Sequence, residues 1–232
     1  MKEVFNTASK VIITCNKRLS PFLQEEITAL GFEIKRAFNT GVELYASINE
    51  CIRLNLNLRT ASQVLYQIGS FRAHDPKELY DALVQIEWEN YIPFDGYFTV
   101  TSNVHNDTIT TPLFANVKVK DAIVDRIKAN KDVRPNSGPD AHKTVVHLHW
   151  IEERAEIFLD TSGETLAKHG YRKHPGKAPM LEALATSTIM ATKWDGKSPF
   201  VNPMCGSGTL AIEAALIAQN RMPGLQRMNY AF

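Results

Sequence analysis

Hydrophobic and polar residues alternate in short runs along the first 160 residues of this 232-residue chain. The pattern predicts strands at 11–15, 63–68 and 97–104, and hairpins that pair 32–35 with 42–45 and 145–151 with 155–159. Apolar residues at helical spacing predict helices at 21–30, 47–58, 75–86 and 113–129. Short strands mixed with helices are typical of α+β proteins, and the stretch from 48 to 161 suggests a ferredoxin-like or related module.

Beyond residue 160 the pattern changes to longer apolar segments. Residues 162–178 are rich in Gly, Lys, Arg and His, and they are interpreted as a linker. A helix at 179–194, a strand at 199–203 and a helix at 209–221 are predicted to follow as the start of a parallel sheet. The last helix is almost entirely apolar, so we expect it to be buried against that sheet.

Composition limits the class of protein. With 44% hydrophobic residues, 22% charged residues and a net charge of +1, the chain is typical of a soluble globular protein. No apolar run is long enough to span a membrane. Three widely spaced cysteines give neither a disulfide framework nor a zinc site, which favours a reducing cytoplasm. His147 and His149 share one strand face but lack a third ligand, so no metal is predicted.

Residues 200–209 have the sequence Phe-Val-Asn-Pro-Met-Cys-Gly-Ser-Gly-Thr, the form of a strand end, a tight loop and a helix start. Glycines let the backbone turn sharply and approach a ligand without an obstructing Cβ. A nucleoside-triphosphate loop would need a lysine after the last glycine, where Thr209 stands. A dinucleotide fingerprint would need an acidic residue about 20 positions later, and none follows Glu213. A dinucleotide site is therefore the weakest interpretation, although Gly206–Ala211 has the G-x-G-x-x-A form, and a structural turn and an S-adenosylmethionine site remain beside it.

The same run resembles the first cofactor motif of RNA and DNA amino-group methyltransferases, usually Asp-Pro-x-Cys-Gly-Ser-Gly-Thr. The resemblance implies that S-adenosylmethionine contacts Asn202, Pro203, Met204, Cys205, Gly206, Ser207, Gly208 and Thr209. Asn202 stands where the motif usually has Asp, whose charge would pair with the cofactor's ammonium group. An amide accepts a hydrogen bond but carries no charge, so we expect a weaker affinity for the cofactor.

Further segments extend the resemblance to a family of bacterial large-subunit ribosomal RNA methyltransferases. These segments are Lys118–Asp125, Arg134–Asn136, Leu159–Gly163, Gly170–Arg172 and Ala178–Glu182. The family is similar to guanine-N2 methyltransferases with an N-terminal THUMP domain, and its members have often been labelled N6-adenine-specific DNA methylases. The resemblance covers nearly the whole chain and implies an α+β fold. It implies an N-terminal ferredoxin-like part (1–47), a THUMP RNA-binding domain (48–161), a linker (162–178) and the start of a Rossmann-like α/β methyltransferase domain (179–232).

The resemblance also implies an activity: S-adenosylmethionine-dependent methylation of a guanine exocyclic N2 amine in large-subunit ribosomal RNA. The family's catalytic Asn-Pro-Pro-Tyr motif lies well downstream of the glycine loop, and no Asn-Pro-Pro occurs in this chain. We therefore assign no catalytic residue and expect a truncated, inactive portion of a longer enzyme. A stand-alone RNA-binding module and an N6-adenine DNA methylase are the alternatives, and the oligomeric state stays open.

Two clusters of cations are candidate contacts for ribosomal RNA, since Lys and Arg supply sequence-independent affinity for phosphate. One comprises Lys118, Lys120 and Arg134, although such residues equally form the solvated face of a helix. The other lies in the linker and comprises Lys168, Tyr171, Arg172 and Lys173, with His169, His174 and Lys177 nearby. Cations mixed with an aromatic ring suit single-stranded or flipped nucleotides. The linker cluster is the stronger candidate.

Overall fold

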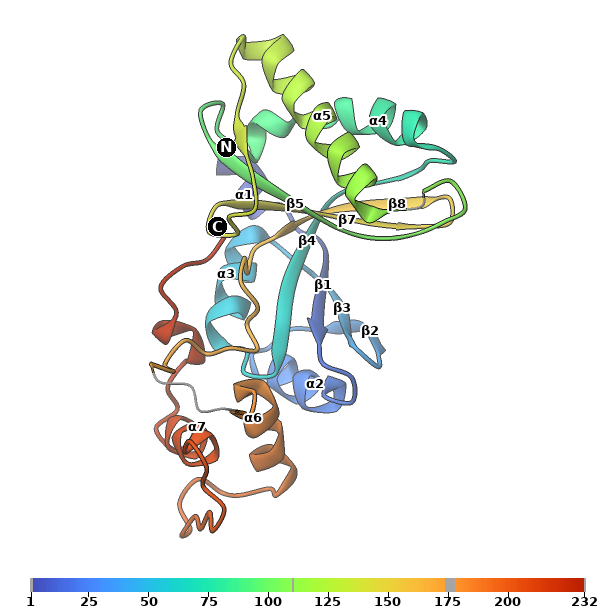
Figure 1. The fold of residues 1–232 in the computed structure, drawn as a ribbon. Helices are drawn as coiled ribbons and strands as arrows, with labels where there is room; N and C mark the ends of the chain where they lie inside the picture. The colour runs from blue at the N-terminus through green and yellow to red at the C-terminus, as the bar shows by residue number, and fades with distance from the viewer. Residues whose placement is uncertain (1, 110, 174–177, 232) are drawn as a thin grey trace. The chain divides into compact units, whose positions relative to one another are not determined.

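The computed structural model describes residues 2–109, 111–173 and 178–231, and the chain divides into two compact units. The first unit contains residues 65–164 and short segments from both chain ends (Figure 1). The second unit combines residues 10–64 with residues 165–229, so distant parts of the sequence share one body. Strand β4 (Ala61–Arg72) begins in the second unit and ends in the first.

The first unit is a sheet covered on one face by helices α4 and α5 (Figure 1). Besides β4, its elements are α1 (Lys2–Asn6), α4 (Pro76–Val84), the 3-10 helix η1 (Trp88–Asn90), β5 (Tyr97–His105), α5 (Pro112–Lys131), β6 (Asn136–Ser137), β7 (Thr144–Ile151) and β8 (Arg154–Asp160). The strand order is β4-β8-β7-β5-β6. β8 pairs antiparallel with β4 and β7, whereas β5 pairs parallel with β7 and β6.

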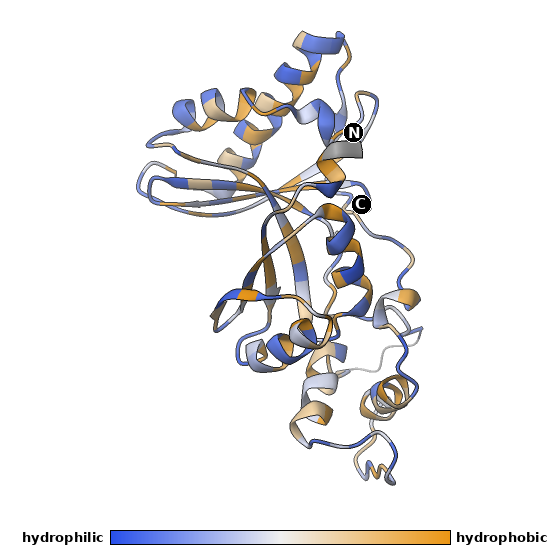
Figure 2. Cartoon of the chain, turned by 180° about the vertical axis from the view of Figure 1, so that it is seen from behind, coloured by the Kyte–Doolittle hydropathy of each residue, from blue (hydrophilic) through white to orange (hydrophobic). Residues whose placement is uncertain are grey.

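Amphipathic spacing places the core of this unit between sheet and helices. Along α5 the buried residues are Ala115, Val119, Ala122, Ile123 and Ile127, as the periodicity predicts. Figure 2 shows the alternation of hydrophilic and hydrophobic stretches along this helix. Trp88 and Trp150 are fully buried, and their indole N–H groups donate to the carbonyls of Leu83 and Ala73. Both tryptophans are therefore core residues of the first unit.

The second unit opens with a small α+β layer. Its elements before β4 are β1 (Ser9–Cys15), α2 (Ser20–Ala29), β2 (Ile34–Phe38), β3 (Gly41–Ala46) and α3 (Ile48–Asn57), and the strand order is β2-β3-β1-β4. α3 begins at a capping box, in which Ser47 Oγ accepts from Glu50 N–H and the Glu50 carboxylate accepts from Ser47 N–H. Leu23, Ile27, Leu44 and Leu54 are fully buried.

The remainder of the second unit contains α6 (Glu182–Ala191), α7 (Thr209–Ala218) and the 3-10 helix η2 (Pro223–Gln226). The predicted helix at 179–194 therefore begins three residues late, at Glu182. The predicted strand at 199–203 is wrong, because these residues form no strand. A strand needs a ladder partner, and within the described residues no strand lies beside this segment to supply one. β6 was not predicted because two residues carry no periodicity.

Candidate cofactor site

The predicted cofactor residues, 202–209, form one contiguous loop that leads into α7. Gly206 and Gly208 have φ angles of +52° and +80°, in the left-handed region that favours glycine. A Cβ at either position would meet no atom within 4 Å. Backbone conformation, and not crowding, is therefore the reason for glycine here, and the space beside the loop is open.

The N-terminus of α7 has no side-chain cap. Gly208 is its N-cap residue, and no side chain accepts a hydrogen bond from the first turn. Unpaired N–H groups and the helix dipole together favour an anionic or polar ligand group at such a position. The local geometry is thus compatible with the carboxylate or hydroxyl groups of a nucleoside cofactor.

The side-chain amide of Asn202 also bears on whether the loop fits a cofactor. Its side-chain amide nitrogen is buried and has no hydrogen-bond partner among the described residues. Buried amides are normally satisfied, so the group is poised to donate to a ligand or water. The neutral amide does not supply the charge that Asp would place there. The loop therefore fits S-adenosylmethionine in backbone shape, with a neutral group at the usually acidic position.

Two of the predicted RNA-binding residues, Tyr171 and Arg172, are half-buried, and Arg172 contacts this loop. The Arg172 guanidinium contacts Ser207 and Thr209 as well as the Glu182 carboxylate. The Tyr171 hydroxyl is buried, and burial, followed by the nearby charge of Glu213, raises the pKa of this phenol. Lys168 and Lys173 are exposed, whereas His174 and Lys177 lie outside the described residues.

A buried polar network lies behind the loop. Glu213 is fully buried within α7 and accepts from His169 Nδ1 at 2.8 Å and from Thr186 Oγ1 at 2.9 Å. His169 Nε2 donates to the Arg59 carbonyl at 2.9 Å. The imidazole therefore lies between a carboxylate and a backbone carbonyl, and each ring nitrogen has a hydrogen-bond partner. This network joins the 169–172 segment to α6, α7 and residue 59.

Sequence reasoning missed this network because the 168–173 cluster was interpreted as a candidate contact for RNA. A usable signal was present. Glu213 is the lone acid in an otherwise apolar helix, and a buried carboxylate requires partners. Histidine, tyrosine and arginine close together in a preceding segment are suitable partners.

The other predicted RNA contacts lie in the first unit. Lys118 and Lys120 are half-buried residues of α5, and the Lys118 ammonium lies 5.6 Å from the centre of the Phe114 ring. Arg134 follows the helix and is exposed. The two predicted clusters thus fall in different units. Each stays a prediction.

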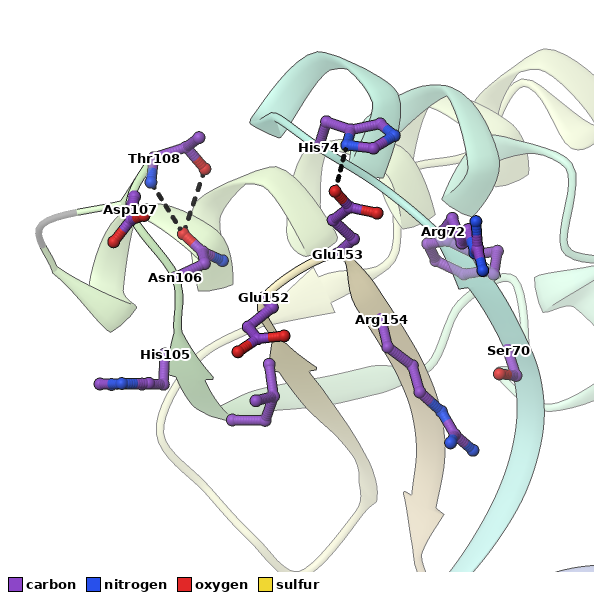
Figure 3. A pocket seen from close by; sticks show the side chains of 12 residues that line it. Ser70, Arg72, His74, His105, Asn106, Asp107, Thr108, Glu152, Glu153 and Arg154 are labelled. Atoms are coloured by element: carbon purple, nitrogen blue, oxygen red, sulfur yellow. Dashed lines mark hydrogen bonds and ion pairs between the residues drawn. The ribbon is translucent and has the colours of Figure 1, made fainter.

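A separate hollow of about 830 Å³ lies in the first unit, at the ends of β4 and β5 and the turn before β8 (Figure 3). Arg72, Arg154, His74 and His105 line it together with Asp107, Glu152 and Glu153. His74 Nδ1 lies 3.2 Å from the Glu153 carboxylate. Because cations and carboxylates alternate around the hollow, its charge does not single out a polyanion.

The histidine pair of β7 lies on the sheet of the first unit. His147 Nδ1 lies 2.8 Å from Thr101 Oγ1, and His149 Nδ1 lies 3.4 Å from Asn103 Nδ2. Burial, with a smaller contribution from His149, lowers the pKa of His147 to about 4. In the described ranges, no group of three or more His, Cys, Asp or Glu side chains is arranged to hold a metal ion. No described helix has the length and apolarity needed to cross a membrane.

Comparison with known proteins gives three consecutive family matches along the chain. Residues 10–65 match the RlmL ferredoxin-like domain, residues 73–160 match the THUMP domain, and residues 169–232 match the RMKL-like methyltransferase domain. Among curated proteins, the ribosomal RNA large subunit methyltransferases K/L of Psychromonas ingrahamii and Vibrio campbellii are 37% and 36% identical. These matches cover 93% and 90% of this chain but only 29% and 30% of the relatives.

Solved structures agree on the architecture. A predicted N6-adenine-specific DNA methylase from Listeria monocytogenes has a TM-score of 0.84 at 30% identity, over 96% of this chain and 58% of that one. SMU.472, a methyltransferase complexed with SAH, has a TM-score of 0.84 at 28% identity, over 97% of this chain and 59% of that one. TrmN from Thermus thermophilus, at 17% identity, shares the fold alone, with a TM-score of 0.66.

The order of these domains defines a class: proteins in which a ferredoxin-like domain and a THUMP domain precede a methyltransferase domain. The α+β architecture expected from the sequence is confirmed. Within this class, the chain belongs to the RlmL-like family of THUMP methyltransferases. It corresponds to the family's N-terminal portion and spans less than a third of the curated relatives named above.

Proposed function

We propose that this chain is part of an S-adenosylmethionine-dependent methyltransferase that modifies a guanine exocyclic N2 amine in large-subunit ribosomal RNA. The THUMP domain would grip structured RNA, and the methyltransferase domain would receive a base extruded from its stack. The observation that carries the proposal is the open glycine loop at the uncapped N-terminus of α7, preceded by the matched THUMP domain.

The roles proposed for this chain's residues are binding roles. Gly206 and Gly208 allow the backbone to approach the cofactor, and the first N–H groups of α7 donate to its polar groups. Asn202 supplies a neutral amide beside the loop. The bound cofactor would supply an electrophilic methyl group. Orientation of the target amine requires the Asn-Pro-Pro-Tyr motif, which these 232 residues lack.

The chain carries its own probe of cofactor binding. Cys205 lies in the loop and is exposed, whereas Cys15 and Cys51 are buried, which raises the pKa of their thiols to about 11 and about 12. A chromogenic aromatic disulfide should therefore react first with Cys205, because the thiolate is the reactive form. S-Adenosylhomocysteine at millimolar concentration should slow this reaction. NAD at the same concentration is the control, and equal slowing by both, or by neither, contradicts the proposal.

The DNA-methylase alternative keeps one supporting observation, the name of the Listeria relative. The two functions share the cofactor motif, so cofactor binding does not separate them. Competition between RNA and DNA for binding to the chain does separate them. A THUMP-bearing rRNA enzyme should prefer a structured fragment of large-subunit rRNA over duplex DNA of equal length at the same salt concentration, and the opposite preference favours the DNA methylase.

A further inference from the structure

Arg172 makes an unusual number of contacts for a residue of a glycine- and lysine-rich segment. Its Nε donates to the Glu182 carboxylate at 3.2 Å, and Nη2 donates to the Met180 carbonyl at 2.9 Å. Two further bonds reach the glycine loop: Nη1 to Ser207 Oγ at 3.2 Å and Nη2 to Thr209 Oγ1 at 3.2 Å. One guanidinium therefore spans the start of α6 and the end of the loop.

The loop has few other restraints of its own. Its glycines have open space on their Cβ side, and α7 lacks a side-chain cap. Within the loop, Gly208 N–H donates to the Cys205 carbonyl at 2.8 Å, and the Ser207 and Thr209 hydroxyls lie 3.3 Å apart. Both of these hydroxyls are also the ones that Arg172 contacts. An arginine 35 and 37 residues earlier in the chain therefore supplies side-chain contacts to this end of the glycine loop.

The pairing with Glu182 fixes the arginine itself. The two side chains are 16% and 5% exposed, so the ion pair is largely withdrawn from water. Removing one partner of a buried pair leaves an uncompensated charge, which is strongly unfavourable. Four of the five guanidinium N–H groups are used by acceptors within the second unit. Little donor capacity is left for an RNA phosphate.

We propose that Arg172 is a positioning residue, which clamps the Ser207–Thr209 end of the glycine loop to the start of α6 and so preorganises the loop for its ligand. The ligand in this statement rests on the proposed function. The clamp itself does not, because it is a property of the unliganded chain. Preorganisation of this kind lowers the conformational cost of binding.

The test uses amide hydrogen exchange at Gly208, with no cofactor present, as the reporter of loop opening, because this N–H donates to the Cys205 carbonyl at 2.8 Å. Arg172→Gln removes the charge and most donors, and Arg172→Lys keeps the charge but not the planar group that reaches several acceptors at once. Lys173→Gln is the matched control, since it removes an exposed cation from the adjacent position. Thermal unfolding monitors the unit as a whole.

We expect Arg172→Gln to accelerate exchange of the Gly208 amide by about tenfold, the loss expected for charge-assisted hydrogen bonds. Arg172→Lys should fall between this variant and the unchanged chain. Lys173→Gln should leave the rate unchanged.

Two results would overturn the clamp. One is a lower melting temperature for Arg172→Gln with unchanged exchange of the Gly208 amide, which makes Arg172 merely structural. The other is unchanged loop behaviour with a loss of RNA binding, which makes it an RNA contact. Failure of S-adenosylhomocysteine to protect Cys205 would contradict the proposed function and leave the clamp result standing.

Discussion

The α4–α5 layer of the first unit and the α6–α7 pair of the second unit differ in how completely their apolar residues are buried. α5 buries a stripe of five residues against strands, and Trp150 and Phe98 are fully enclosed beneath it. α7 is far more apolar, yet Ile212 is 39% exposed, and Val201 and Met204 before it are 81% and 87% exposed. Hydrophobic composition therefore does not establish burial. A helix that is apolar on all sides needs neighbours on all sides.

The same contrast separates the functions proposed for the two regions. In the proposed function, the THUMP domain, which has its own core, would bind RNA. The glycine loop would form one wall of a cofactor pocket and would supply no residue for chemistry on a base. Four experiments test this difference between the two units.

The largest expected effect concerns catalysis. Residues 1–232 should transfer no detectable tritium from labelled S-adenosylmethionine to ribosomal RNA, whereas a version extended through an Asn-Pro-Pro-Tyr-like motif should be active. The physical reason is that the Asn-Pro-Pro-Tyr motif, which is proposed to orient the target amine, does not occur in these 232 residues. Comparable rates for the two proteins would show that the glycine loop region is catalytically complete.

Stability should respond to core packing in the first unit and hardly at all to exposed apolar residues in the second. Trp150→Ala removes a fully buried ring and should lower the free energy of unfolding by about 3–5 kcal/mol. Val201→Ser, at an exposed position, should change it by less than about 0.5 kcal/mol. Urea unfolding followed by circular dichroism measures both. A large loss for Val201→Ser would mean that this residue is covered.

The first unit should also lose stability in mild acid. His147 has a pKa lowered from 6.5 to about 4, so between these values the unfolded chain binds a proton that the folded chain does not. Stability should therefore fall as the pH drops through this window, by at most about 1.4 kcal/mol per pH unit, with no further loss from this group below pH 4. His147→Gln should reduce the difference in unfolding free energy between pH 7 and pH 5. An unchanged difference excludes His147 as the cause.

The smallest effect concerns the distribution of RNA contacts between the units. Lys120→Gln in the first unit and Lys173→Gln in the second should each weaken rRNA-fragment binding a few-fold and reduce the salt slope by about one. Lys197→Gln, also exposed, is the control. Gel-shift titrations at two salt concentrations measure the slope. A reduction confined to one variant would assign the RNA contacts to its unit.

Local signals predicted most elements of the fold. The helices predicted at 47–58 and 75–86 correspond to α3 and α4, and their first turns are capped by the sequence neighbours Ser47 and Asp75. The prediction of a strand at 199–203 was wrong, because a strand depends on a partner elsewhere in space. The glycine loop was predicted from its motif. The contacts of Arg172 were not predicted, since its acceptors on Glu182, Ser207 and Thr209 become its neighbours only after folding.

The buried carboxylate of Glu213 has a consequence for the order of folding. α7 gains little by docking before His169 and Thr186 are in place, because a desolvated carboxylate without its donors is strongly unfavourable. Docking of the helix and ordering of the 169–172 segment should therefore occur in one cooperative step. The rotation of α7 about its own axis is fixed in the same step, since only one rotation brings Glu213 to its partners. A helix with almost uniform hydrophobicity thus obtains a unique docked orientation from a single charge.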